Sequence, residues 1–250
     1  MEFNFSDQRI SLDTGSQTAV LNKVAGLLRR GDGFALATIN LDHLVKLATS
    51  PAFRTAYAGH EIVVADGRPI VALSKMAGRT VELMPGSELI LPLCWVAAAE
   101  NVPVALVGST KAALADAASA LKRDVPGLNI SLCLAPSGAF DPDSDEAGTI
   151  LDHLAQAGIG LCFLALGAPK QEIFAHRGRA VAPRVGFVSI GAGLDFLGGH
   201  QRRAPLVMRQ LGLEWLWRWL SSPLRLGPRY VKCLLILPGH IVQALRLRGR

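Results

Sequence analysis

The chain has 250 residues, of which half are apolar and 18% are charged. This composition excludes a disordered chain, and the length suits one large α/β domain or two small ones. The four cysteines lie far apart with no C-x-x-C pair, which is typical of a reduced cytosolic protein and argues against a zinc cluster or redox motif. The N-terminus is polar and acidic, so we expect no signal peptide.

The positive charge is concentrated at the C-terminal end of the chain. Residues 200–250 contain nine Arg, one Lys and one acid, a net charge of +9, whereas residues 1–199 carry 16 basic and 19 acidic side chains, a net charge of −3. Three of the four tryptophans, Trp215, Trp217 and Trp219, lie in the same segment. We therefore divide the chain into an α/β body, residues 1–199, and a basic helical appendage, residues 200–250.

Helical and strand-like patterns alternate along the body. Helices are predicted over residues 16–30, 41–49, 69–76, 87–100, about 110–121, 145–157 and from 170, and buried strands over 34–39, 61–65, 102–107, 128–134, 161–166 and 185–190. Apolar strands separated by helices of about ten to fifteen residues predict a parallel sheet with helices on both faces, a Rossmann-like α/β fold. In such folds ligands bind at the carboxyl ends of the strands.

The tail beyond Pro205 has a different pattern. We predict a helix over residues 206–220, a break at Pro223, and further helix over 225–248 that is interrupted at Pro238-Gly239. The apolar run around residues 233–237 is much shorter than the roughly 18 to 20 residues that cross a bilayer. Because tryptophans and arginines are interleaved, we expect the tail to lie on a membrane surface. A basic helix packed on the body is the alternative.

Asp66 is the first candidate for a catalytic group. It follows a predicted strand and precedes a glycine, so its carboxylate is expected at the carboxyl edge of the sheet. There it can take the proton of an attacking hydroxyl group, although an Asp-Gly pair also serves as a plain turn. Thr38 and Asn40 end the preceding strand and can orient a hydroxyl or a phosphate at the same edge. Alternatively they cap the helix that begins at Leu41.

Two glycine turns are candidates for binding a phosphorylated donor. GAPKQE, residues 167–172, ends one strand at Gly167 and opens a helix, whose free N–H groups favour an anion. Lys170 and Gln171 can then contact a diphosphate or a base edge. Gly191 begins a GAGLDF turn after another strand. This turn lacks the third glycine of the dinucleotide fingerprint, which argues against a Rossmann-type oxidoreductase, the alternative enzyme.

The sequence predicts neither a metal site nor another cofactor. No D-x-D pair ends an apolar strand, and the acidic residues 141–145 fit a solvated turn before a helix better than a calcium loop. Positive side chains would then have to stabilise a leaving diphosphate. Arg218, Arg225 and Arg229 of the tail are the candidates, with lipid headgroups as their alternative ligand. A protein that binds nucleic acid through this basic tail is the non-enzymatic alternative.

Taken in order, the motifs resemble the WecG/TagA/CpsF family of bacterial glycosyltransferases. The matching stretches are TINLDHL from Thr38, ADGRPIV from Ala65, PGSEL from Pro85, LALGAPKQE from Leu164, SIGAGLDFLGGHQRRAP from Ser189 and LEWLWRWLSSPLRLGPRY from Leu213. Together they cover nearly the whole chain. GAPKQE combined with the RAP and EWLWR stretches is specific as a set.

The resemblance implies an inverting, metal-independent transfer from a UDP-sugar to a saccharide on a polyprenyl diphosphate, in bacterial surface or exopolysaccharide synthesis. The enzyme would be cytoplasmic and peripheral on the inner face of the plasma membrane. Asp66 matches the family's proposed base, Thr38 and Asn40 its acceptor-side polar pair, and Gln171 the glutamine of GxPKQE. The arginines of the tail match an appendage that completes the site at the membrane.

The sequence departs from the family pattern near the PGSEL stretch. Leu83 stands where the family usually has arginine, and Glu88 where it usually has aspartate. We therefore expect the donor or acceptor pocket to differ from that of better-known members. The resemblance leaves open whether a hexose or an N-acetylhexosamine is transferred. It predicts no nucleic-acid partner and allows a homo-oligomer.

Overall fold

The computed structural model describes residues 1–5, 7–201, 204–205, 207–208 and 214–249, with the side chains of Glu214, Arg218, Ser221 and Arg225 outside the description. The strands are β1 (Glu2–Asn4), β2 (Arg9–Ser11), β3 (Phe34–Ile39), β4 (Ile62–Ala65), β5 (Val104–Gly108), β6 (Ile130–Leu134), β7 (Leu161–Ala165) and β8 (Gly186–Ser189). The helices are α1 (Gln17–Arg30), α2 (Leu41–Thr49), α3 (Pro51–Ala58), α4 (Arg68–Met76), α5 (Gly86–Ala99), α6 (Lys111–Asp124), α7 (Asp145–Gln156), α8 (Lys170–Val181), α9 (Gly193–Leu197), α11 (Glu214–Ser221) and α12 (Pro223–Arg248).

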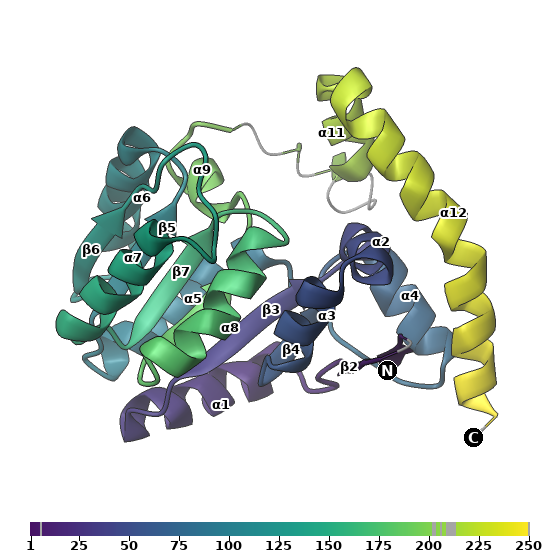
Figure 1. The fold of residues 1–250 in the computed structure, drawn as a ribbon, viewed down its shortest axis with the longest axis horizontal. Helices are drawn as coiled ribbons and strands as arrows, with labels where there is room; N and C mark the ends of the chain where they lie inside the picture. Colours follow the sequence, from purple (N-terminus) through teal and green to yellow (C-terminus); the bar gives the residue numbers. More distant parts are fainter. Residues whose placement is uncertain (6, 202–203, 206, 209–213, 250) are drawn as a thin grey trace.

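Six strands form one parallel sheet in the order β4-β3-β8-β7-β5-β6. Helices lie on both of its faces (Figure 1). The predicted α/β class, with a parallel sheet flanked by helices and a helical C-terminal segment, is confirmed. Each predicted body element is present, with ends that differ by no more than three residues.

The alternation of side chains along β3 shows how the two faces are filled. Phe34 and Leu36 pack into a cluster with α1, α5, α6 and α9, whereas Ala35 packs on the opposite face with α7 and α8. Ala37 and Ile39, also on that opposite face, pack with α2, α3 and α4. All six residues of β3 are buried, which is the continuous apolar pattern expected of a central parallel strand.

Four of the described elements were absent from the prediction, among them the five-residue helix α9. The strands β1 and β2 form an antiparallel pair of three residues each, too short for a periodic signal, and Phe3 and Ile10 anchor them in the core. The helix α3 follows α2 directly: Ser50 ends α2 and caps α3 through its side chain, with Pro51 in the first turn. A break was expected before Pro51, but a new helix after it was not.

The helix α12 runs from Pro223 to Arg248, so the predicted interruption at Pro238-Gly239 is wrong. Proline removes one backbone hydrogen bond from a helix interior. Packing offsets this loss, because Ile236, Leu237 and Ile241 on both sides of the proline lie against the core cluster of α2 and α4. The break predicted at Pro223 is confirmed, since α11 ends at Ser221. The part of the predicted helix 206–220 that precedes α11 falls partly outside the described residues.

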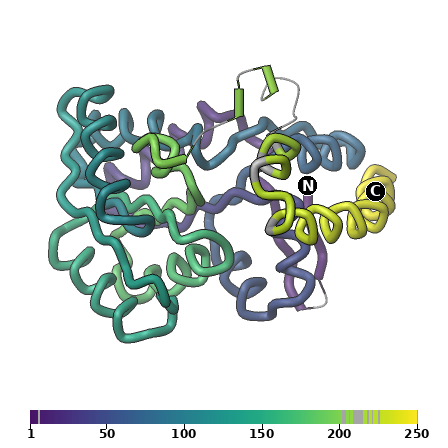
Figure 2. The backbone as a smooth tube through the Cα atoms, turned by 90° about the horizontal axis from the view of Figure 1, so that it is seen from above, coloured from purple at the N-terminus to yellow at the C-terminus, as the bar shows by residue number. Residues whose placement is uncertain are grey.

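The helix α12 lies along the body for most of its length. It contacts α2 and α4, and the ring of His240 meets Phe3 of β1 at 5.6 Å between centroids. Figures 1 and 2 both show it as a long rod at one side of the molecule, with the two chain termini near each other. Its first turns also contact α11, where Trp215 meets Tyr230 edge to face.

Within the described residues, one helix has the length and composition to cross a membrane. It is Leu226–Arg248, 23 residues, whose most apolar 18-residue stretch has a mean hydropathy of 1.2. This stretch is longer than the apolar run recognised in the sequence, because the helix continues through Pro238.

Candidate active site

The predicted site residues follow four neighbouring strands of the sheet. In the order β4, β3, β8 and β7, the carboxyl ends are followed by Asp66, Asn40, Gly191 and Gly167. Because the strands are parallel, these ends lie at one edge of the sheet. The topology therefore brings together segments that are up to 151 positions apart in the sequence, from Asn40 to Gly191.

Asp66 is a half-buried carboxylate held by the backbone and by Asn40. Its N–H donates to the Ile39 carbonyl at 2.8 Å, and Asn40 Nδ2 donates to Asp66 Oδ2 at 3.1 Å. The other end of the Asn40 amide, Oδ1, accepts the N–H of His43 and caps α2. That bond fixes which atom of the amide faces the carboxylate. The interpretation of Asn40 as a helix cap is therefore confirmed, whereas its role in orienting a hydroxyl or a phosphate stays a prediction.

Gly67 makes the turn that leaves Asp66 at the edge. Its φ of 95° lies in the region that favours glycine, and α4 begins at the next residue. A residue with a side chain would be strained here, so the Asp-Gly pair is required by the backbone. The same turn places the carboxylate beyond the end of β4, where it is only partly covered.

Two buried and neutral rings, those of Tyr57 and His43, lie next to the backbone of Thr38. Its side chain is 5% exposed, and its carbonyl accepts the Tyr57 hydroxyl at 2.7 Å. The same hydroxyl lies 2.9 Å from His43 Nδ1, which must donate because the tyrosine proton is already used. Burial lowers the pKa of His43 to about 4 and raises that of Tyr57, with the charges of Glu172 and Asp66 adding to the second effect.

Gln171 joins the two glycine turns. Its side chain is 2% exposed; Oε1 accepts the N–H of Gly191 at 3.1 Å, and Nε2 donates to Glu172 Oε1 at 2.8 Å. Gly167 and Gly191 both have positive φ, 71° and 58°. The amide predicted to meet the donor is thus used within the protein, where it fixes the spacing of the turns after β7 and β8. Lys170 is half-buried and begins α8.

Glu172 is a buried acid that the sequence did not single out. It is fully buried, and burial raises its pKa to about 7, although the bond from Gln171 acts in the opposite direction. Its Oε2 atom has no hydrogen-bond partner. Its place in GAPKQE is visible in the sequence, but nothing in the spacing separates a buried first-turn glutamate from a solvated one.

A cluster of three charged residues connects the tail to the site. The two oxygens of Asp42 pair with Lys46 Nζ and with Arg229 Nε, each at 2.8 Å. Lys46 Nζ also donates to the Ala168 carbonyl in the GAPKQE turn at 2.9 Å. Arg229, predicted to contact the donor, is therefore paired with a body carboxylate. The i,i+4 spacing of Asp42 and Lys46 was the available sequence signal for this cluster.

The other two tail arginines lie in helices of the described chain. Arg218 belongs to α11 and Arg225 to the first turn of α12, and the side chains of both lie outside the described residues.

The two departures from the family pattern lie next to the site. Leu83 pairs with Ala65 at the end of β4, and its side chain is 38% exposed. Glu88 lies in the first turn of α5. This helix begins against the Gly191 turn, because a Cβ added at Gly86 would lie 3.0 Å from the Ile190 Cα atom.

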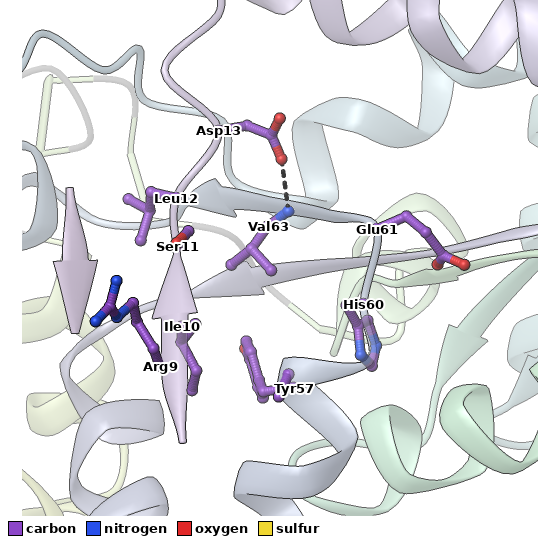
Figure 3. Close-up of a pocket in the computed structure, with 10 residues that line it drawn as sticks. Arg9, Ile10, Ser11, Leu12, Asp13, Tyr57, His60, Glu61 and Val63 are labelled. Carbon is purple, nitrogen blue, oxygen red and sulfur yellow. Dashed lines mark hydrogen bonds between the residues drawn. The ribbon is translucent and has the colours of Figure 1, made fainter. Parts of the chain in front are cut away.

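Two surface hollows lie away from this edge. The one in Figure 3, about 290 Å³, lies between β2, the end of α3 and the start of β4. Its polar groups are largely paired: Asp13, for example, accepts the Val63 N–H at 2.9 Å. The second, about 620 Å³, is lined by residues 30–33, 179 and 183–184. None of the predicted site residues lines either hollow.

The remaining predictions concern the acidic turn and metal binding. The acidic turn at residues 141–145 leads into α7, which Ser144 caps through its side chain, as expected of a solvated turn before a helix. In the described part of the chain, no group of three or more His, Cys, Asp or Glu is arranged to hold a metal ion.

The fold is a parallel α/β sheet of the class in which ligands bind outside the carboxyl ends of the strands, and a carboxylate held by Asn40 lies at that edge. The chain matches the model of the "Glycosyl transferase WecG/TagA/CpsF family" over residues 6–250, nearly its full length, and belongs to this family. The family resemblance found in the motifs is thereby confirmed. Membership makes the chain a glycosyltransferase of cell-surface polysaccharide synthesis, with a sugar-nucleotide donor and a lipid-linked acceptor.

Proposed function

We propose that this enzyme transfers a sugar, with inversion and without a metal ion, from a UDP-sugar to a saccharide carried on a polyprenyl diphosphate. The observation that carries the proposal is the Asp66–Asn40 pair at the sheet edge, next to the glycine turns after β8 and β7. A half-buried carboxylate held by an amide is suited to accept a proton from a bound hydroxyl.

In the proposed reaction a hydroxyl oxygen of the acceptor attacks the anomeric carbon of the donor. The bond between that carbon and the diphosphate oxygen breaks, and the hydroxyl proton passes to the Asp66 carboxylate. Attack from the face opposite the diphosphate inverts the anomeric configuration. Asn40 keeps the carboxylate turned toward the edge, and Thr38 lies two residues before Asn40 as an acceptor-side group.

The glycine turns are the proposed site of the donor diphosphate. The chain bends sharply at Gly167 and Gly191, and α8 begins three residues after Gly167 with Lys170. A helix start and a lysine favour an anion here. Gln171 supports this geometry by tying the two turns together. Arg218, Arg225 and Arg229 are proposed to supply positive charge from the tail as the diphosphate leaves.

We further propose that α12 docks the enzyme on the cytoplasmic face of the membrane. One side of this helix packs on the body through Cys233 and Ala244, whereas its outer side exposes Leu224, Leu234 and Leu235. A helix packed along a globular body on one side is suited to lie in the membrane surface, with its apolar side in the lipid. Crossing the bilayer would require it to leave the body.

The test is a reaction of the purified enzyme with a panel of UDP-sugars and lipid-linked acceptors, with products identified by mass. A product heavier by one sugar, formed in the presence of a metal chelator, is expected for one donor class. Failure of every UDP-sugar to react, with an acceptor known to be intact, would reject the proposed donor. The anomeric configuration of the product, from its NMR coupling constants, tests inversion.

A further inference from the structure

The first turn of α2 is a junction between the tail and both parts of the proposed site. Asn40 caps this helix and donates to Asp66. Asp42, two residues after Asn40, is 8% exposed. It pairs with two cations from different directions, Lys46 of the same helix and Arg229 of α12. The same short segment therefore contacts the base and the tail helix.

The second contact of Lys46 extends the junction to the GAPKQE turn. Its ammonium group lies 2.8 Å from Asp42 Oδ2 and donates to the Ala168 carbonyl at 2.9 Å. Ala168 follows Gly167 and precedes the helix that carries Gln171. A chain of three polar contacts thus runs from α12 through α2 to the turn proposed to bind the donor diphosphate.

The exposure of the partners indicates which link opens first. The side chains of Arg229 and Lys46 are 42% and 32% exposed, whereas that of Asp42 is 10% exposed. If α12 moves away, Arg229 can be solvated, but Asp42 stays in the body with Lys46 as its remaining cation. Asp42 then has Lys46 as its one partner and attracts it more strongly. The Lys46 ammonium group therefore shifts relative to the Ala168 carbonyl.

We propose that Asp42 is a positioning residue that couples the docking of α12 to the geometry of the GAPKQE turn. It acts through Lys46 and has no direct contact with the substrates. The tail on the membrane and the donor turn at the sheet edge are thereby linked. The consequence for catalysis rests on the proposed function, whereas the coupling itself is a property of the free protein.

Hydrogen exchange of the full-length protein tests the coupling without any substrate. Arg229→Gln cuts the link to the tail, and Lys46→Met cuts the link to the turn while keeping an apolar stem. We expect Arg229→Gln to speed exchange in residues 164–172 roughly two- to fivefold, the size expected for a partly exposed ion pair. In the Lys46→Met background the same substitution is expected to add nothing, because the chain of contacts is already broken.

Arg246→Gln is the matched control. It removes the same charge from the same helix, about 25 Å along the axis from Arg229, and is expected to leave exchange of residues 164–172 unchanged. Asp42→Asn is expected to reproduce the double variant. Should this protein fold poorly, the Arg229 and Lys46 variants still decide the question.

Two results would overturn the proposal. One is normal exchange of residues 164–172 in Arg229→Gln although residues 226–233 exchange faster. The other is an equal effect of Arg229→Gln with and without Lys46→Met, which would show that Arg229 influences the turn by a route other than Lys46. Titration with UDP separates this question from the proposed function. Its Kd is expected to rise by the same factor in Arg229→Gln and Lys46→Met. A protein that binds no UDP counts against the proposed donor, and the exchange comparison still decides the coupling.

Discussion

The body and the tail helix α12 use their apolar residues differently. The strands of the body bury theirs almost completely; Phe34, Leu36 and Ile39 of β3 have no exposed surface. In α12, Leu224, Leu234 and Leu235 are 93%, 65% and 74% exposed. The body therefore buries its apolar surface within the fold, whereas α12 buries only one of its two sides. The exposed leucines on the outer side of α12 support the proposal that this side docks on a membrane surface.

The largest expected effect concerns the chemistry of the body. Asp66→Asn keeps the shape of the side chain but removes the group proposed to accept the proton. We expect the transfer rate to fall by about 10³-fold, within the range of general-base catalysis, with unchanged unfolding and unchanged membrane retention. The measurement is product formation by mass together with liposome co-sedimentation. Transfer at the normal rate would remove Asp66 from the mechanism.

The second prediction concerns the exposed outer side of α12. Replacing Leu234 and Leu235 together by Asp puts two charges on the outer side of α12. Each leucine contributes about 2 kcal/mol when it is transferred out of water, so retention on anionic liposomes is expected to fall at least tenfold.

The control is Leu91→Asp, an equal change at a 38% exposed leucine of α5 in the body. It is expected to leave retention on the liposomes as it is. Equal retention of the double variant and the native protein would contradict membrane docking through α12.

The third prediction concerns the interior of the body alone. Burial raises the pKa of Glu172 from 4.5 to about 7. The unfolded chain loses this proton at lower pH than the folded one, so ionisation favours unfolding as pH rises from about 4.5 to 7. Glu172→Gln removes this destabilisation and keeps an acceptor for Gln171. We expect it to increase the free energy of unfolding at pH 8 by about 3 kcal/mol and to have no stabilising effect at pH 4.

Urea unfolding at pH 4, 6 and 8 measures this difference. A Glu172→Gln protein that is equally destabilised at all three values would show that the carboxylate has a structural role that the amide does not fill.

The fourth prediction concerns His60, whose effect on stability is of similar size but has the opposite dependence on pH. Burial lowers the pKa of His60 from 6.5 to about 4, and its Nε2 atom is unpartnered. Its contribution is fully present above about pH 6.5 and is lost as pH falls toward 4, because only the unfolded state takes up the proton. His60→Gln is expected to remove on the order of 3 kcal/mol of this dependence. The check is the slope of unfolding free energy against pH for the variant and the native protein; identical slopes would contradict it.

Much of the fold and the outline of the site followed from local patterns. The apolar strands and their lengths, the turn at Asp66-Gly67 and the caps Asn40 and Thr110 are encoded in neighbouring residues. Contacts such as Tyr57 with the Thr38 carbonyl were not predictable, because α3 itself was not recognised. The continuity of α12 through Pro238 also depended on packing against α2 and α4, which the sequence does not display.

The sequence by itself determined the parallel α/β class, the division of charge between body and tail, and the motifs that identify the family. These properties depend on composition, short-range periodicity and the order of short motifs, all of which can be read along the chain without knowing its contacts. Only the tertiary structure decided that Arg229 pairs with Asp42, that Lys46 reaches Ala168, and that Gln171 is buried between two glycine turns. Such contacts join residues far apart in the chain. They exist only because the sheet order places the ends of β3, β8 and β7 side by side and because α12 packs on α2.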